Sequence, residues 1–515
     1  MSLGFWNFAA KDPAALALVE PDGREHTRGA LLAEANRLVH GLRALGLGPG
    51  DAVAVVLPNG APVLELYLAT FQAGLYLVPI NHHLAAPEIA YILADSEAKA
   101  FVADEAFAAT CAAAADEAGL PAAARFAVGA LPGFRPYAAL KEGRSPELPD
   151  DRRAGAVMNY TSGTTGRPKG VRRPLAPLAP DVVATLYTGL LGMFGIQPED
   201  GNVHLVGSPL YHTAVLMFST ASLHMGHPLV VMDKWRPEDC LRAIERYRVT
   251  TSHMVPTQFH RLLKLPADVR GEADVTSLRT MIHAAAPCPV DVKRRMLDWW
   301  GDAIFEYYAA TEGGGTLVTP GEWRRKPGTV GRAWPGAEIR IFDDAGADCP
   351  PGTPGTVYMK RGQADFEYYK DKEKTERVRR GDHFTVGDVG YLDEDGYLFL
   401  CDRKSDMIIS GGVNIYPAEI EAVLLGHPKV ADAAVFGIPH EDWGEEVKAV
   451  IEPVPGAAPG PALGEEILAL CRDKLARYKW PRSIDYVDEM PRDPNGKLYK
   501  RKLRDPYWAG RERAI

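Results

Sequence analysis

The chain has 515 residues, too many for one hydrophobic core, and we expect it to fold into about two to four lobes. Hydrophobic residues make up 46% and charged residues 24% of the chain, which is typical of a globular protein. The formal net charge is −9, and this acidic balance argues against a nucleic-acid partner, whose phosphates a protein must neutralise.

The six cysteines are far apart and form no C-x-x-C pair, so we expect neither a disulfide framework nor a zinc site. The first residues do not combine a basic region with a long apolar segment, and no signal peptide is expected. The most apolar run, residues 64–80, contains Glu65 and is shorter than the roughly 20 residues that a membrane span needs. These features predict a soluble, cytoplasmic protein without a transmembrane segment.

Helices and apolar strands alternate in the first part of the chain. Residues 33–47 space their apolar positions like an amphipathic helix, and residues 48–60 follow as a turn, a buried strand and a second turn. Residues 64–81 and 87–104 each repeat a helix followed by an apolar strand. This alternation, which continues to about residue 320, predicts an α/β fold with a largely parallel sheet.

Beyond residue 320 the chain changes to short strands separated by Gly and Pro turns, which predicts a β-rich lobe at the end of the large domain. The alternation of helices and strands returns after Asp402 and predicts a smaller α+β domain. Basic residues gather at 497–505, where a solvated helix face is the simplest interpretation of most of the charges, Lys500 and Lys502 included.

The segment NYTSGTTGRPKG (159–170) has the composition of a phosphate-binding loop. A Walker A loop requires a lysine directly after its second glycine, at the start of a helix. Here Lys169 stands three residues after Gly166 and follows Pro168, which removes a backbone donor and opposes helix entry. A standard P-loop is therefore excluded. Glycine N–H groups and Thr and Ser hydroxyls still suit an anion, although a flexible turn can have the same composition.

The full string YTSGTTGRPKG is far more specific than its composition, and further motifs follow it in a fixed order. They are SPLYHT (208–213), HAAAPCP (283–289), EYYAATEGG (306–314), GTVGRAWPG (328–336), the long stretch from VGDVGYLDEDG to NIYPAEIE (386–421) and PRDPNGKLYKRKLR (491–504). Together they resemble the adenylate-forming superfamily of acyl-CoA synthetases, aryl-CoA ligases, luciferases and peptide-synthetase adenylation domains. The resemblance covers the chain from about residue 10 to 504 and is strongest to AMP-forming fatty-acyl-CoA ligases.

The resemblance implies a reaction in two halves that uses ATP, Mg²⁺ and CoA. A carboxylate first attacks the α-phosphate of ATP to give an acyl-adenylate and pyrophosphate, and a thiol then displaces AMP. It also implies an N-terminal ATP- and acyl-binding domain (1–401) and a mobile C-terminal domain (402–515) that rotates about a hinge at Asp402.

The resemblance assigns most of the nucleotide contacts to short motifs. Glu312 would ligate Mg²⁺, Thr311 would contact the α-phosphate, and Lys497 would stabilise the transition state of adenylation. The residues that would contact the rest of the nucleotide are Thr161, Ser162, Gly163, Thr164, Thr165, Gly166 and Lys169 at the phosphates, Asp388 and Arg403 at the ribose, and Tyr308, Ala284, Ala285 and Ala286 at the adenine. Core packing is the alternative for Tyr308, and a place in the basic tail is the alternative for Lys497.

The resemblance also assigns the contacts with the CoA thiol and its nucleotide to the C-terminal domain. Gly411 and Gly412 would line the thiol tunnel after the domain rotates, and Trp443, Tyr478 and Arg482 would contact the CoA nucleotide. Trp480 stands where some relatives have a second basic residue, a departure that weakens the expectation of CoA contacts there.

The identity of the acid depends on the residues around SPLYHT. Amino-acid-activating relatives place an Asp at 211–214 to pair with the substrate ammonium, and this chain has Tyr, His, Thr and Ala. His212 matches a gate of the carboxylate tunnel, with a structural buried histidine as the alternative. Ala309 narrows the expected acyl channel, whereas the three glycines after Glu312 widen it. We expect a medium- or long-chain fatty acid, or a bulky alicyclic acid, rather than acetate.

Two other functions stay open. A ligase of this superfamily can load its acyl-adenylate onto the phosphopantetheine of a carrier protein, and a non-catalytic protein could bind acyl-adenylate or acyl-CoA. Retention of Glu312, Asp388 and Lys497 argues against the non-catalytic alternative. The sequence leaves a homodimer open.

Overall fold

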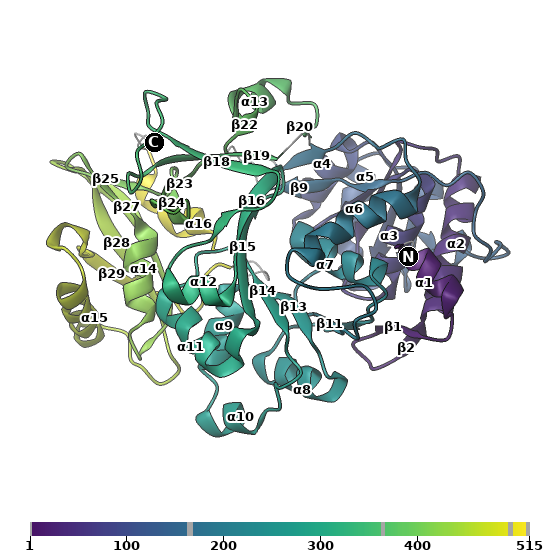
Figure 1. The fold of residues 1–515 in the computed structure, drawn as a ribbon. Helices are drawn as coiled ribbons and strands as arrows, with labels where there is room; N and C mark the ends of the chain where they lie inside the picture. Colours follow the sequence, from purple (N-terminus) through teal and green to yellow (C-terminus); the bar gives the residue numbers. More distant parts are fainter. Residues whose placement is uncertain (1–2, 162–167, 362–365, 493–497, 511–515) are drawn as a thin grey trace. The chain divides into compact units, whose positions relative to one another are not determined.

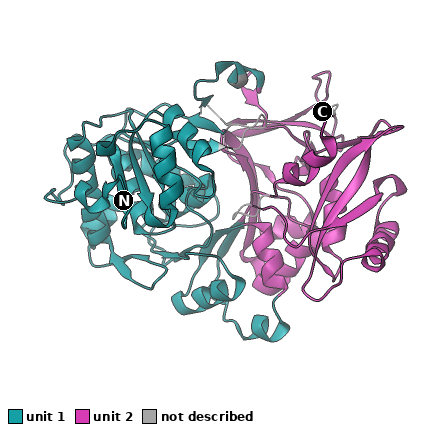
Figure 2. Cartoon of the chain, turned by 180° about the vertical axis from the view of Figure 1, so that it is seen from behind, with its two compact units in different colours: residues 1–254, 265–282, 364–377 teal, residues 255–264, 283–363, 378–515 magenta. Residues whose placement is uncertain are grey.

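The computed structural model describes residues 3–161, 168–361, 366–492 and 498–510 (Figure 1). The chain forms two compact units (Figure 2). Unit 1 comprises residues 1–254, 265–282 and 364–377, and unit 2 comprises residues 255–264, 283–363 and 378–515. The boundary between residues 401 and 402 stays a prediction.

A parallel sheet forms the first half of unit 1, with the strand order β7-β6-β5-β3-β4-β8. Its strands are β3 (Ala52–Val56), β4 (Tyr76–Pro79), β5 (Ala98–Asp104), β6 (Arg125–Val128), β7 (Arg135–Pro136) and β8 (Ala156–Val157). The helices are α2 (Arg28–Ala44), α3 (Ala61–Ala73), α4 (Ala86–Asp95) and α5 (Ala108–Glu117). This arrangement confirms the predicted α/β class.

Both faces of this sheet are covered by helices, which explains why its strands are apolar throughout. Successive strand residues point to opposite faces, so Val53 and Val55 join the core beneath α2 and α3. Ala54 and Val56 join a second core with α4 and α5. Local sequence sets the helix ends: Thr27 Oγ1 accepts the Ala30 N–H at 3.2 Å before α2.

A second sheet in unit 1 has the order β14-β13-β11-β12-β1-β2, and the β1–β12, β12–β11 and β11–β13 pairs are parallel. The strands are β1 (Leu16–Val19), β2 (Glu25–Thr27), β11 (His204–Val206), β12 (Leu229–Val231), β13 (Thr251–Met254) and β14 (Thr280–His283). The other helices of the unit are α1 (Phe5–Lys11), α6 (Pro180–Gly192), α7 (Thr213–His224), α8 (Pro237–Tyr247), α10 (Ala267–Glu272) and α13 (Lys372–Arg377).

Three short strands of unit 1 flank the glycine- and threonine-rich loop. They are β9 (Asn159–Thr161), β10 (Lys169–Arg172) and β20 (Glu367–Tyr368), in the antiparallel order β20-β10-β9. Residues 162–167, which connect β9 to β10, lie outside the described residues.

The strands of unit 2 up to residue 403 pair in antiparallel fashion, and they begin at β15, before residue 320, where the sequence had predicted the change to short strands. One group is β15 (Ile304–Ala310), β16 (Gly313–Val318) and β17 (Arg332–Ala333). The other is β18 (Ala337–Phe342), β19 (Gly355–Arg361), β21 (Arg379–Arg380), β22 (His383–Phe384), β23 (Asp388–Leu392) and β24 (Leu398–Arg403). The neighbouring helices are α9 (Pro256–Leu263), α11 (Val290–Trp300) and α12 (Pro320–Arg325).

The C-terminal part of unit 2 has its own sheet, in the order β26-β25-β28-β27 with β29 parallel to β28. Its elements are β25 (Ile408–Ser410), β26 (Val413–Ile415), α14 (Pro417–Leu425), β27 (Val430–His440), β28 (Gly444–Pro453), α15 (Pro461–Lys474), β29 (Ser483–Tyr486) and α16 (Lys500–Arg504). Residues of α14 and α15 share one apolar core with β27 and β28.

Buried histidines in unit 1 predict a fall in stability at acid pH. Burial lowers the pKa of His204 and His224 to about 3 and that of His253 to about 4. The unfolded state binds a proton on each below about pH 6.5, whereas the folded state does not, so stability falls as the pH falls. These three histidines together should make the free energy of urea unfolding roughly 4 kcal/mol lower at pH 5.5 than at pH 7.5.

His224→Gln provides the matched comparison. The ring of His224 accepts the Phe5 N–H at 3.1 Å through Nδ1 and contacts the Tyr67 hydroxyl at 3.1 Å through Nε2. Glutamine takes up no proton, so the difference between the two pH values should shrink by about 1.4 kcal/mol. An unchanged difference would show that His224 does not couple folding to protons.

Candidate active site

Three of the predicted nucleotide residues lie together in unit 2. Tyr308 comes from β15, Asp388 opens β23, and Arg403 closes β24 directly opposite Asp388 in the strand pair. The Tyr308 hydroxyl donates to Asp388 Oδ2 at 2.6 Å, and Arg403 Nε lies 3.4 Å from Asp388 Oδ1. Residues 80 positions apart in the sequence therefore meet at one carboxylate.

The resemblance predicts that the carboxylate of Asp388 accepts hydrogen bonds from a ribose. Asp388 is buried, and burial together with the nearby charge of Asp388 raises the pKa of Tyr308 well above its ordinary value, so the phenol stays protonated and donates. A carboxylate has about four lone-pair sites, and Tyr308 and Arg403 face one oxygen each. Sites therefore remain for the two hydroxyls of a ribose.

Thr311 and Glu312 form the turn between β15 and β16, beside a register shift at Ala309 and Ala310. Glu312 is buried. A buried carboxylate suits Mg²⁺, which commonly takes one or two protein carboxylates and completes its shell with phosphate oxygens and water. Among the described residues, no group of three His, Cys, Asp or Glu side chains could hold a metal ion.

Gly315, one of the three glycines after Glu312, does not mark the free space that the sequence suggested. A Cβ at Gly315 would lie 2.4 Å from the Tyr308 carbonyl oxygen and 2.7 Å from the Trp334 ring. Gly314 has φ +70°, which favours glycine. The expectation of room for bulkier side chains is therefore wrong at Gly315, where glycine lets β16 approach β15.

Gly315→Ala should lower the free energy of unfolding by about 1–3 kcal/mol and weaken ATP binding, because the new methyl displaces the backbone at Tyr308. Thermal unfolding and the KM for ATP measure the two effects. Gly321→Ala in α12 is the control, since its Cβ meets only the Arg325 side chain at 3.8 Å and alanine favours a helix. Equal behaviour of the two variants would contradict the packing argument.

The segment predicted to border the adenine follows β14. Ala284 is buried, Ala285 is exposed with φ +76°, and Ala286 is intermediate. A left-handed backbone at a residue other than glycine costs about 1–2 kcal/mol, and such strain gathers at functional sites. The turn supports the prediction that this backbone faces a ligand.

Asp402, the predicted hinge, caps a helix of the C-terminal part. Its Oδ2 accepts the Ala418 N–H at 2.8 Å in the first turn of α14. Burial raises the pKa of Asp402. Lys500, which we expected to be solvated, instead lies 2.8 Å from Glu421 in a half-buried pair, and the charges of Glu421 and Asp402 raise its pKa although burial alone would lower it. Lys502 is exposed, as expected.

Several of the residues predicted for the thiol step lie around one exposed tryptophan. Trp443 accepts the Gly411 N–H at 2.9 Å through its carbonyl, and the Arg482 guanidinium lies 5.0 Å from its ring centroid. His440 stacks on the same ring at 4.9 Å, a contact that the sequence did not indicate. Gly411 and Gly412 both have positive φ in the turn from β25 to β26.

The other two aromatic residues of this region differ in exposure. Tyr478 is exposed and has no described contact with Trp443. Trp480 donates its indole N–H to the Leu475 carbonyl at 2.9 Å and packs on the C-terminal core. Trp480 therefore stabilises the C-terminal core.

His212 directly precedes α7 in unit 1 and belongs to a group of aromatic rings. Its ring lies 4.5 Å from Tyr211, and Tyr211 meets His82 edge-on at 5.1 Å. His82 stacks on Phe107 at 4.6 Å, and burial lowers its pKa to about 4, so it is neutral at pH 7. Sequence reasoning missed His82, whose partner Tyr211 is far along the chain.

Lys169 has an acidic partner that the sequence did not reveal. It opens β10 opposite Thr161, and its ammonium forms an ion pair with Asp371 just before α13. The predicted residues Ser162 to Gly166 and Lys497 lie outside the described residues, so their roles stay predictions.

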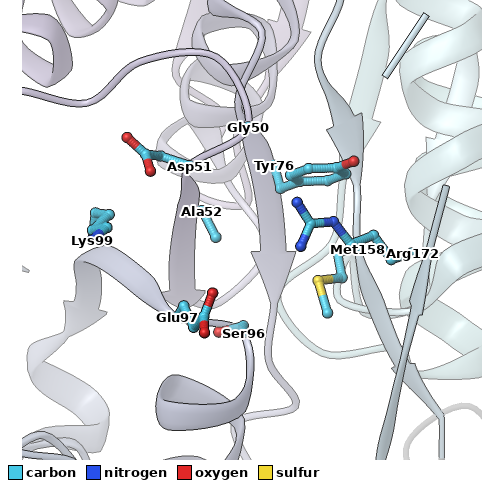
Figure 3. Close-up of a pocket in the computed structure, with 9 residues that line it drawn as sticks. All are labelled: Gly50, Asp51, Ala52, Tyr76, Ser96, Glu97, Lys99, Met158 and Arg172. Carbon is cyan, nitrogen blue, oxygen red and sulfur yellow. The ribbon is translucent and has the colours of Figure 1, made fainter. Parts of the chain in front are cut away.

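A small pocket in unit 1 is lined by none of the predicted site residues (Figure 3). It sits where β3, β4 and β5 begin, and its lining includes Asp51, Tyr76, Glu97 and Arg172. Its volume of about 60 Å³ has room for a few waters. Ligands of parallel α/β sheets bind at the opposite, carboxyl ends of the strands.

The parallel α/β fold, the buried Asp388 that Tyr308 and Arg403 contact, and the buried Glu312 are compatible with an enzyme that uses a nucleotide. A family model described as AMP-binding enzyme matches residues 5–369, and one described as AMP-binding enzyme C-terminal domain matches residues 419–497. The chain belongs to this family, the adenylate-forming superfamily.

Full-length relatives agree with this assignment. The fatty acid–[acyl-carrier-protein] ligase ScoC of Streptomyces coeruleorubidus is 32% identical over 99% of this chain and 97% of its own. The feruloyl-CoA synthase of an Amycolatopsis species is 36% identical over 98% of both chains. The crystal structure of ATP-bound MatB from Rhodopseudomonas palustris has a TM-score of 0.81 and 32% identity, covering 98% of this chain and 99% of that one.

The protein is therefore an AMP-forming acid–thiol ligase of a family that uses ATP, Mg²⁺ and CoA. Among the described residues, no helix is both long enough and apolar enough to span a membrane.

Proposed function

We propose that this protein is an ATP-dependent acyl-CoA ligase for a medium- or long-chain fatty acid or a bulky alicyclic acid. The observation that carries the nucleotide half of the proposal is the contact of Tyr308 and Arg403 with the buried Asp388. Residues 211–214 hold no carboxylate, which supports an acid without an ammonium group.

In the first half-reaction, a carboxylate oxygen of the acid attacks the α-phosphorus of ATP, and the bond to pyrophosphate breaks. Asp388 holds the ribose, Thr311 contacts the α-phosphate, and Lys497 offsets the negative charge that gathers in the transition state. Glu312 would hold Mg²⁺, which neutralises phosphate charge. The loop at 161–166 and Lys169 bind the departing pyrophosphate.

In the second half-reaction, the thiol of CoA loses its proton, and its sulfur attacks the acyl carbonyl while AMP leaves. We propose that residues 402–515 rotate at Asp402 between the two steps, so that Gly411 and Gly412 line the thiol path. Trp443 and Arg482 offer an aromatic face and a cation to the CoA nucleotide, and His212 gates the acid.

The test is pyrophosphate release across a panel of acids, with and without CoA, followed by mass spectrometry of the thioester. Release with long or alicyclic acids and a CoA thioester as product is the expected result. If no acid causes pyrophosphate release although the protein binds nucleotide, the protein is a binding protein and not a ligase.

Transfer to a carrier protein is the second candidate, because the 32%-identical ScoC is a ligase of that kind. Adding a phosphopantetheinylated carrier protein to the same assay distinguishes the two. If an acyl-carrier product forms without any CoA thioester, the carrier protein and not CoA is the acceptor.

A further inference from the structure

A buried ion pair in unit 2 includes Glu306 on β15, the strand that also carries Tyr308. Lys293 on α11 has 0% of its surface exposed, and its ammonium hydrogen-bonds to Oε2 of Glu306 on β15, which is 5% exposed. Nε2 of His283 lies 3.5 Å from the same oxygen. The ring of Trp323 covers the ammonium at 5.0 Å.

Stability alone does not explain this pair. Removing two charges from water costs several kcal/mol per ion, and well-packed apolar residues in their place are often as stable or more so. Burial raises the pKa of Glu306 against the opposing effect of Lys293, which shows that the site is poor for a charge. What the pair supplies is a fixed geometry between the elements that it joins.

Those elements carry the proposed adenine and ribose contacts. Glu306 precedes Tyr308 by two residues on β15, so both side chains point to the same face of the strand. His283 directly precedes Ala284 and the left-handed Ala285. One carboxylate thus connects the strand that presents the Tyr308 hydroxyl to Asp388 with the turn predicted to border the adenine.

We propose that Glu306 and Lys293 are positioning residues for the nucleotide. They do not touch ATP; they fix β15 and the turn at 284–286 so that Tyr308 holds Asp388 in the geometry that accepts the ribose. This inference rests on the proposed nucleotide site.

The test is a double variant, Glu306→Gln with Lys293→Met, which removes both charges and keeps both shapes. It should remain folded, because no charge is left unpaired, yet raise the KM for ATP about tenfold while the KM for the acid stays within about twofold. Lys293→Arg keeps the charge pair and should keep much of the ATP affinity.

A control ion pair lies in unit 1. The half-buried Lys141 pairs with the buried Glu65 at 3.0 Å and with Glu34 at 2.6 Å, and Tyr137 also donates to Glu65. Lys141→Met with Glu65→Gln should lower the melting temperature and leave the KM for ATP unchanged. A purely structural role for Glu306 would make the two double variants alike.

Three outcomes decide the matter. A wild-type KM for ATP in the Glu306/Lys293 double variant, with a raised KM in Tyr308→Phe, overturns the positioning role alone. Unchanged KM values in Tyr308→Phe and in Asp388→Ala overturn the proposed nucleotide site and this inference with it. If the double variant does not fold, Glu306→Asp replaces it, since the shorter acid keeps its charge, and an unchanged KM for ATP there overturns the proposal.

Discussion

Lys497→Ala is expected to slow acyl-adenylate formation by at least about a hundredfold while leaving thioester formation from supplied acyl-adenylate within about twofold. The reason is electrostatic: the first step brings a carboxylate against an α-phosphate, and a flexible ammonium can bridge the oxygens of both. The second step breaks an anhydride that is already activated, and the proposed rotation of residues 402–515 moves Lys497 away before it.

The two steps are measured separately. Pyrophosphate release from ATP and acid reports the first, and thioester formed from purified acyl-adenylate and CoA reports the second. Lys502→Ala, which removes an exposed lysine from the same basic segment, is the control and should change neither rate. An equal loss of both half-reactions in Lys497→Ala would contradict the two-conformation account.

The fold was accessible from the sequence because its pattern is local. The apolar strands 52–56 and 76–79 and the helix between them are visible in the periodicity, and burial on both faces follows from runs such as AVAVV. The motifs likewise identified Tyr308, Asp388 and Arg403 one by one. Their contact could not be derived from the residues, because it depends on the register of β23 against β24 and on where β15 packs.

The errors have the same origin. Lys500 looked solvated because a run of charges shows no partner, and its partner Glu421 lies 79 residues earlier, in α14. Gly315 looked like free space because the sequence does not show the carbonyl of Tyr308 beneath it. Charge pairs and close contacts between backbones depend on the tertiary structure, which a local sequence pattern does not show.

The Lys293–Glu306 pair had a signal that could have been found. Lys293, Met296, Leu297 and Trp300 follow the i, i+3, i+4, i+7 spacing of a buried helix face, and all four are buried. A lysine on such a face requires a counter-charge, because a buried ammonium without one is costly. The sequence thus implied a buried acid without showing that it was Glu306.

Asp388→Ala is expected to lower kcat/KM for ATP by at least about a hundredfold, since hydrogen bonds to a charged group are worth about 1.5–3 kcal/mol each and two ribose hydroxyls lose their acceptor. Tyr308→Phe removes only the hydroxyl that donates to Asp388 at 2.6 Å, and a loss of about tenfold is expected. Steady-state adenylation with varied ATP measures both variants. The KM for the acid shows whether the substitution also affects the binding of the second substrate.

Deoxynucleotides separate the role of the ribose from general damage to the fold. The wild-type enzyme should prefer ATP over 2′-deoxy-ATP by about tenfold, because one hydrogen bond to the Asp388 carboxylate is missing. In Asp388→Ala that preference should vanish, since neither nucleotide finds the acceptor, whereas Tyr308→Phe should keep part of it. A variant that loses activity but still discriminates between the two nucleotides would show that the ribose is held elsewhere, and that Asp388 serves the packing of β23 against β15 instead.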